Sequence, residues 1–166
     1  MARTPIQAAG GIVVRSGARP LIAVVQRTKD DRWVLPRGKL KRKEQPKSGA
    51  RREAFEETGH RVKVREFLGA ITYRAQGRPK LVRFWHMQAA ENPSRDLMRD
   101  IAAVAWLPLG EAVKRLTYPL EKLFLAGVGR ALVRKKRRAR AAHKSSKKKP
   151  AGKSAKTKTR KRGQGR

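Results

Sequence analysis

The chain has 166 residues, which is enough for one domain with a hydrophobic core and a short appendage. Its 44 lysines and arginines against 12 acidic residues give a formal charge of +32, which is too basic for an ordinary enzyme and indicates a polyanionic partner. The absence of cysteine excludes disulfides and thiolate metal sites, and no apolar run is long enough to span a membrane.

Apolar and alternating segments predict strands and helices along most of the chain. A helix is expected from about Pro46 to Thr58, because proline suits a first helical turn and Gly59 suits the left-handed residue just past the last turn. Strands on both sides of this helix, and helices late in the chain, predict a mixed sheet between helices. In chain order we expect strands at residues 7–15, 21–26, 33–35, 61–70, 71–74, 81–89 and 102–107, a loop or short helix at 91–100, and helices at 46–58, about 110–116 and from 119 onward.

The positive charge is concentrated at the carboxyl end of the chain. Residues 130–166 contain 18 basic residues and no acidic one, whereas residues 1–129 contain 26 basic and all 12 acidic residues. The last 23 residues have no aromatic or aliphatic side chain larger than that of alanine, so they cannot bury enough surface to fold. We therefore predict a folded domain over residues 1–135 and a disordered basic tail over residues 136–166 that binds nucleic acid or another polyanion without sequence preference.

Three glutamates share one face of the expected helix. Glu53 precedes Glu56 by three residues and Glu57 by four, so the three carboxylates lie on the same side. Carboxylates this close repel one another, and a hard divalent cation with oxygen ligands would remove that repulsion. Taken alone, the glutamates also allow a solvated acidic face in which Arg52 pairs with Glu56.

The longer spacing around these glutamates resembles the signature of the Nudix hydrolases, and the resemblance covers roughly residues 7–132. It implies an α/β/α sandwich with a mixed sheet. His60 departs from the pattern, because the family usually has an aliphatic residue there, and this departure concerns local packing more than chemistry. The positions that match the signature are Gly38, Glu44, Arg52, Glu53, Glu56, Glu57 and Gly59.

The resemblance implies that water attacks a phosphorus within a pyrophosphate linkage. Mg²⁺, or Mn²⁺ in its place, would activate the water and neutralise phosphate charge. Glu56 and Glu57 are implied as metal ligands, and Glu53 as a further ligand or as the group that handles the proton of the water. The carbonyl of Gly38 would complete the ligand set.

Other residues are expected to support this site. Arg52 would orient Glu53, and Glu44 would lie outside the coordination sphere of the metal. Related families draw another acidic residue from a later loop, for which the candidates are Glu91, Asp96 and Asp100. Phosphate contacts are expected from the cations that flank the signature and from one on a later strand: Arg27, Arg37, Lys39 and Arg83.

Aromatic residues are the candidates for stacking a base. Trp33, Trp85 and Trp106 could each do so, but Trp85 and Trp106 lie in apolar strands and are predicted to belong to the core. The three histidines show no paired spacing for a metal, and we assign them no role.

Three short segments, Trp33–Gly38, Ile71–Arg74 and Leu116–Pro119, resemble the diadenosine polyphosphate and diphosphoinositol polyphosphate hydrolases. We therefore expect Mg²⁺-dependent hydrolysis of pyrophosphate linkages in nucleoside diphosphate compounds, above all in dinucleoside polyphosphates.

Diphosphoinositol polyphosphates and oxidised nucleoside triphosphates are alternative substrates. A nucleic-acid-associated protein with a non-catalytic Nudix module is the alternative class, which the complete glutamate set opposes. Without a signal-peptide core, a cytoplasmic location is expected. The sequence does not predict the oligomeric state.

Overall fold

The computed structural model describes residues 4–146 of the chain. In this part of the chain, the strands and helices follow the order that the sequence predicts, except at residues 37–39 and 62–75. Their bounds are β1 Ile6–Arg15, β2 Leu21–Arg27, β3 Trp33–Val34, β4 Arg37–Lys39, α1 Pro46–Thr58, β5 Val62–Ala75, β6 Arg78–Ala89, β7 Ile101–Leu107, α2 Leu109–Arg115 and α3 Pro119–Ser146.

The strands form one mixed sheet of seven strands. Five of them lie in the order β3-β2-β1-β6-β5, while β4 pairs with β1 and β7 pairs with β2. The pairing of β1 with β6 is parallel, and the other pairings are antiparallel. The long strand β1 is therefore central, and its residues are buried on both faces of the sheet.

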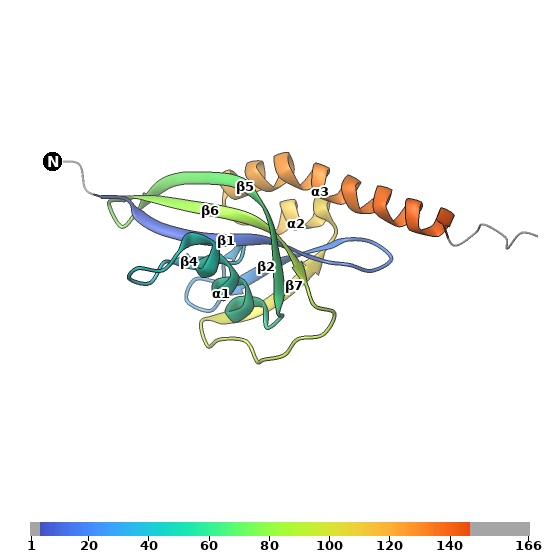
Figure 1. Ribbon diagram of the computed structural model, residues 1–166. Coiled ribbons are helices and arrows are strands. Elements are labelled where there is room, and N and C mark those ends of the chain that lie inside the picture. Colours follow the sequence, from blue (N-terminus) through green and yellow to red (C-terminus); the bar gives the residue numbers. More distant parts are fainter. Residues whose placement is uncertain (1–3, 147–166) are drawn as a thin grey trace, which may run out of the picture.

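Helices cover both faces of the sheet, with α1 on one side and α2 and α3 on the other (Figure 1). Alternate residues of β1 face the two layers: Val13 packs in the core cluster that contains Ala50 and Ala54 of α1. Its neighbour Ile12 packs in the cluster that contains Leu125 of α3. The predicted α/β/α sandwich with a mixed sheet is confirmed.

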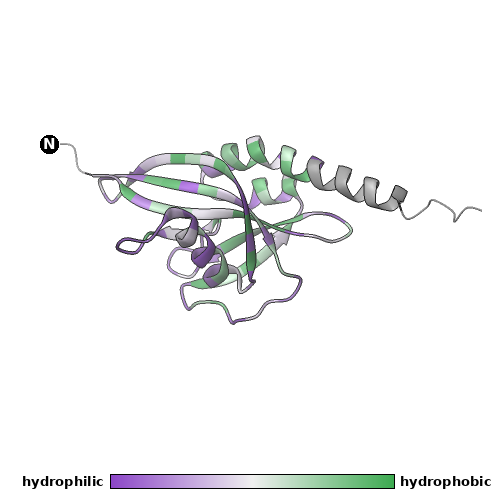
Figure 2. Ribbon diagram, viewed as in Figure 1, coloured by the Kyte–Doolittle hydropathy of each residue, from purple (hydrophilic) through white to green (hydrophobic). Residues whose placement is uncertain are grey.

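Helix α1 occupies the predicted residues, Pro46 to Thr58. Gly59 ends it with a φ of 73°, and its N–H donates to Phe55 O at 3.0 Å. The helix is mostly hydrophilic (Figure 2), and the apolar residues that it buries against the sheet are small, Ala50 and Ala54 among them. A helix of this kind can lie close to the sheet while it keeps a polar face for other use.

Two elements differ from the expected ones. Residues 37–39, which belong to none of the expected strands, form the short strand β4 against β1. The expected strands 61–70 and 71–74 are one continuous strand, β5, which stays paired with β6 through register shifts between Val64 and Gly69. The first difference comes from pairing with β1, which lies far away in the sequence, and the second comes from the continuous pairing of β5 with the next strand, β6.

Helix α3 extends beyond the predicted end of the folded domain. It runs to Ser146, eleven residues past position 135. Those eleven residues are rich in alanine, arginine and lysine, which all favour helix. The rest of the predicted tail, residues 147–166, lies outside the described residues, so the domain boundary stays a prediction. None of the helices in residues 4–146 is long and apolar enough to cross a membrane.

Candidate active site

One arginine of α1 binds three glutamates, of which two lie on the same helix and one lies just before it. Arg52 donates through Nε and Nη2 to the two carboxylate oxygens of Glu44, at 2.8 and 2.9 Å. Its Nη1 donates to Glu53 Oε1 at 2.6 Å and to Glu56 Oε2 at 2.9 Å. The hydrogen bonds from Arg52 hold the pKa of Glu44 at about 2. This geometry agrees with Arg52 orienting Glu53 and with Glu44 acting as the anchor of Arg52.

Glu57 has a different environment. Its side chain is buried, and its Oε2 accepts a hydrogen bond from the backbone N–H of Arg37 at 2.9 Å. Burial raises the pKa of Glu57 to about 8. Burial also raises the pKa of Glu53. Two neighbouring carboxylates therefore have raised pKa values, and a bound cation would stabilise their ionised forms.

Two glycines let the backbone of residues 36–38 lie close to these groups. A Cβ atom on Gly38 would lie 2.1 Å from the Glu53 carboxyl carbon, and a Cβ on Gly10 would lie 2.2 Å from Pro36 O. The N–H of Gly11 also donates to Pro36 O at 3.0 Å. Glycine at position 10 therefore allows β1 to lie close to Pro36, just before β4. Glycine at position 38 leaves room for the Glu53 carboxylate of α1.

These carboxylates open into a pocket of about 550 Å³. Asp100, at the end of the loop before β7, also lines this pocket, whereas Glu91 and Asp96 are outside its described lining. Of the three acidic residues that the sequence left open, Asp100 is the one that the fold brings to the carboxylates. The full lining is Arg27, Lys29, Arg37, Gly38, Lys39, Lys41, Arg52, Glu53, Glu56, Glu57, Lys80, Met98 and Asp100.

The chemistry of the lining fits a hard divalent cation, because the donors are carboxylate oxygens. Among residues 4–146, however, no three acidic or histidine side chains are already gathered closely enough to hold a metal ion. Arg52 Nη1 donates to one oxygen of Glu53 and to one oxygen of Glu56, so both carboxylates already have a cationic partner. Glu53, Glu56 and Glu57 are the residues of this lining that would hold a cation.

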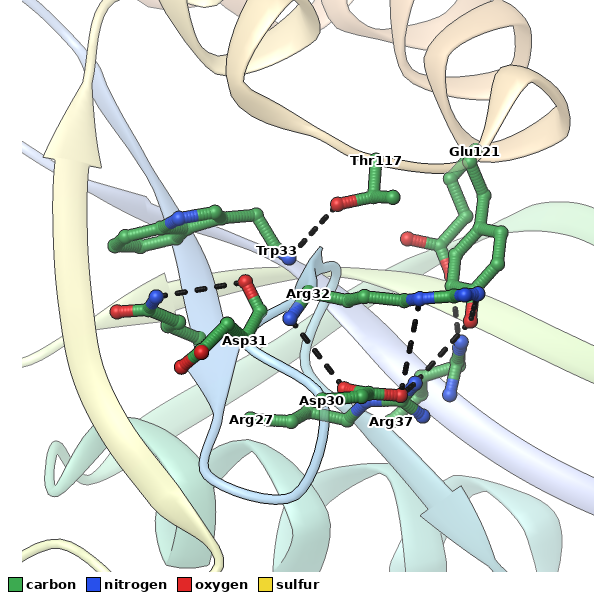
Figure 3. A network of polar contacts seen from close by, with 10 residues as sticks. Arg27, Asp30, Asp31, Arg32, Trp33, Arg37, Thr117 and Glu121 are labelled. Carbon is green, nitrogen blue, oxygen red and sulfur yellow. Dashed lines mark hydrogen bonds and ion pairs between the residues drawn. The ribbon is translucent and has the colours of Figure 1, made fainter.

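A second pocket, of about 650 Å³, adjoins the first. Two tyrosines line it, Tyr73 from β5 and Tyr118 from the turn before α3. The Tyr118 hydroxyl accepts hydrogen bonds from Arg27 at 3.2 Å and from Arg32 at 2.9 Å, and Arg27 also forms an ion pair with Asp30. Figure 3 shows this network on the loop between β2 and β3. The two pockets share five cationic residues: Arg27, Lys29, Arg37, Lys39 and Lys80.

Residues 4–126 match the family model described as NUDIX domain. The chain belongs to the Nudix family. The Nudix hydrolase signature that the sequence resembles is thereby confirmed as a mark of membership.

Two relatives are similar in sequence to this Nudix chain. An 8-oxo-(d)GTP phosphatase of Mycolicibacterium smegmatis is 35% identical over 106 residues, which cover 63% of this chain and 32% of that protein. A MutT-like protein of Streptomyces ambofaciens is 36% identical over 107 residues, covering 64% of this chain and 66% of that protein. The chain thus matches between about a third and two thirds of the length of these relatives.

A solved structure shares the fold. A complex of a C. elegans Ap4A hydrolase superposes with a TM-score of 0.70 and 23% sequence identity, covering 76% of this chain and 97% of that one. This likeness shows the Nudix fold.

The predicted phosphate-binding cations divide into two groups in the Nudix fold. Arg27, Arg37 and Lys39 line both pockets. Arg83 does not line either pocket as described, and its Nη1 donates to Gln7 Oε1 at 2.6 Å. Arg83 therefore lies apart from both pockets, because side chains along a strand alternate between faces, and a phosphate contact by Arg83 stays a prediction.

Lys80 is a pocket residue that sequence reasoning missed. Its side chain is 9% exposed and lies at the junction of the two pockets. Burial, together with the positive charges of Arg37, Lys39 and Arg27, lowers the pKa of Lys80 to about 8. Lys80 comes from the start of β6, and only the tertiary pairing of that strand brings it to the signature helix.

The tyrosines were missed for another reason. Tyr73 and Tyr118 lie within the short segments Ile71–Arg74 and Leu116–Pro119, whose resemblance to known hydrolases assigns no role to either ring. The tryptophans lie elsewhere: Trp85 and Trp106 are partly buried against a core cluster, as predicted. None of the three tryptophans is among the residues that line the two pockets.

His60 is accommodated by packing. The ring is buried, its Nδ1 lies 2.9 Å from Ala90 O, and it meets Trp106 edge to face at 4.9 Å between ring centroids. Because a carbonyl oxygen only accepts, Nδ1 carries the proton. A histidine therefore replaces the usual aliphatic residue without leaving that nitrogen unsatisfied.

Proposed function

We propose that this Nudix chain is a Mg²⁺-dependent hydrolase of pyrophosphate linkages, with Mn²⁺ able to replace Mg²⁺. Glu53, Glu56 and Glu57 would hold the cation with the Gly38 carbonyl, and the cation would activate water and neutralise phosphate charge. Arg52 holds Glu53 and Glu56 through hydrogen bonds, and Asp100 adds a further acid to the lining of the pocket. The complete glutamate set favours an enzyme over a non-catalytic module.

The preferred substrates in this proposal are dinucleoside polyphosphates. The observation that carries it is the set of five cations shared by the carboxylate pocket and the tyrosine pocket. A phosphate chain that runs from one pocket to the other would meet these cations in turn, while Tyr73 or Tyr118 stacks a base. A nucleotide sugar has only two phosphates and would leave part of this charge unused.

We expect the specificity constant to increase with the number of bridging phosphates, by roughly tenfold per phosphate while each one gains a charge-assisted contact. The measurement compares kcat/KM for dinucleoside polyphosphates with from two to five phosphates, at fixed free Mg²⁺. A kcat/KM that does not change with the number of phosphates would contradict the proposal.

Diphosphoinositol polyphosphates are tested in parallel. Because these compounds have no base to stack, Tyr73→Leu should impair hydrolysis of the dinucleotides without impairing hydrolysis of the inositol compounds.

An oxidised nucleoside triphosphate is the second candidate. It is favoured by the 35% identity to a protein named 8-oxo-(d)GTP phosphatase. The tyrosine pocket also contains Gln76, which could donate or accept hydrogen bonds at a base edge, and Asp30, which could accept them. This candidate replaces the first if an 8-oxo-purine triphosphate has a higher kcat/KM than every dinucleotide, and if the unoxidised triphosphate does not.

We also propose that the basic tail binds nucleic acid without sequence preference. Residues 147–166 contain ten basic residues and no acidic one. Their removal leaves α3 whole, so hydrolysis of small substrates should be unchanged while retention on duplex DNA at low salt is lost. For the full chain, log K should fall against log salt with a slope of roughly −0.9 per phosphate neutralised. If the truncated protein keeps the same affinity and slope, the folded domain is the binder.

A further inference from the structure

A buried carboxylate outside the signature reaches the backbone of the site. Glu121 lies in the first turn of α3 and is 2% exposed. Its Oε2 accepts a hydrogen bond from the N–H of Leu35 at 2.8 Å, and its Oε1 accepts one from Arg37 Nε at 2.8 Å. Figure 3 shows Glu121 and Arg37 linked in this way. Both oxygens of one side chain are thus used on the segment that leads to Gly38.

That segment is tied to three elements at successive residues. Leu35 is bound to α3 through Glu121. Pro36 O is bound to β1 through the N–H of Gly11. The N–H of Arg37 is bound to Glu57 of α1 at 2.9 Å. The next residue, Gly38, lies against the Glu53 carboxylate. The positions of two candidate metal ligands, the Gly38 carbonyl and the Glu57 carboxylate, therefore depend on where this segment lies.

A simpler role for Glu121 would be to neutralise the buried charge of Arg37, and to be neutralised by it. It explains the contact between Arg37 and Glu121, whose side chains are 7% and 2% exposed. It does not explain why the second oxygen of Glu121 accepts a backbone N–H two residues away from Arg37. A carboxylate that binds both a backbone N–H and a side chain of one segment fixes the position of that segment and the direction of the arginine.

We propose that Glu121 is a positioning residue of the active site, which holds residues 35–38 so that Gly38 and Glu57 are placed for the cation. Because Arg37 lines both pockets, Glu121 also fixes one of the five shared cations. This inference rests on the proposed metal-dependent function. It assigns a role in the active site to a residue of α3, outside the signature helix α1.

The test is the isosteric substitution Glu121→Gln. The amide has one oxygen acceptor where the carboxylate has two, so it places an NH₂ group either at Arg37 Nε or at the N–H of Leu35. We expect Mn²⁺ binding to the substrate-free protein, measured by calorimetry, to weaken by about 10- to 100-fold. We expect kcat to fall by a similar factor, with a smaller change in KM. The matched control is Glu111→Gln, which removes an exposed carboxylate of α2 that pairs only with Lys114 in the described contacts.

Glu121→Asp is the second variant, in case the glutamine variant does not fold. It keeps the charge but is one methylene shorter, so it cannot reach both Leu35 and Arg37, and Mn²⁺ binding should weaken in the same direction. A purely structural role would lower the melting temperature and leave Mn²⁺ affinity at 25 °C unchanged, which would overturn the inference.

The metal-binding readout separates this inference from the proposed function. If wild type binds Mn²⁺ more tightly than both variants but hydrolyses no polyphosphate, the positioning role stands and the proposed reaction fails. If wild type is active and the folded variants bind Mn²⁺ as wild type does, the positioning role fails alone. A wild-type chain that binds no Mn²⁺ would overturn both.

Discussion

Replacing Glu57 by glutamine should remove most hydrolytic activity and leave the fold intact. The glutamine keeps an acceptor for the Arg37 N–H that now donates to Glu57 Oε2 at 2.9 Å. It also removes the need to bury a carboxylate in a site that raises its pKa to about 8. What the variant loses is an anionic ligand for the cation, and we expect kcat/KM to fall on the order of a thousandfold.

The pH dependence of metal binding gives this prediction a second measurement. Below about pH 8 the proton on Glu57 competes with the cation, so the affinity of wild type for Mg²⁺ should rise as the pH is raised toward 8 and then level off. Glu57→Gln should bind Mg²⁺ weakly and lose this component of the pH dependence. Glu91→Gln, which changes an exposed acid outside the described pocket lining, should behave as wild type. Full turnover by Glu57→Gln would contradict the assignment.

Replacing Lys80 by methionine should weaken substrate binding without weakening the fold. The ammonium group is buried beside Arg37, Lys39 and Arg27, which repel it and help to lower its pKa to about 8. Methionine has a similar volume and no charge, so the melting temperature at pH 7 should stay equal or rise. The phosphate chain would lose one charge-assisted contact, and KM should increase by roughly 10- to 100-fold.

Lys80→Arg is the matched control, because it keeps a positive charge at every accessible pH. In wild type, kcat/KM should fall as the pH rises above about 8, where free Lys80 loses its proton. In Lys80→Arg, kcat/KM should not show the decrease above about pH 8 that comes from deprotonation of Lys80. If Lys80→Met keeps the KM of wild type for a dinucleoside polyphosphate, Lys80 does not contact the phosphates.

The sequence predicted well those parts of the fold that local chemistry determines. Pro46 and Gly59 bracket α1 because one fits a first turn and the other adopts a φ of 73°. The spacing of Glu53, Glu56 and Glu57 places them on one helix, and Arg52 binds two of them directly. These relations span one or two helical turns, and a single stretch of sequence contains all of them.

What could not be predicted depends on residues far apart in the chain. The parallel pairing of β1 with β6 brings Lys80 to the site, and nothing near position 80 reports that pairing. Glu121 is 84 residues from its partner Arg37. Arg37 lines both pockets, but nothing near position 37 in the sequence indicates that its guanidinium also pairs with Glu121.

The length of α3 separates the pocket from the end of the described chain. The helix begins beside Tyr118 and carries Glu121 in its first turn, and its 28 residues span about 42 Å. At physiological salt, the field of an exposed charge decays over about 8 Å. A polyanion anchored where residues 147–166 join the helix would therefore have little electrostatic effect on the pocket. The helix is long enough to serve as a spacer, so the nucleic-acid binding that we propose for the tail would not interfere with the turnover that we propose for the pocket.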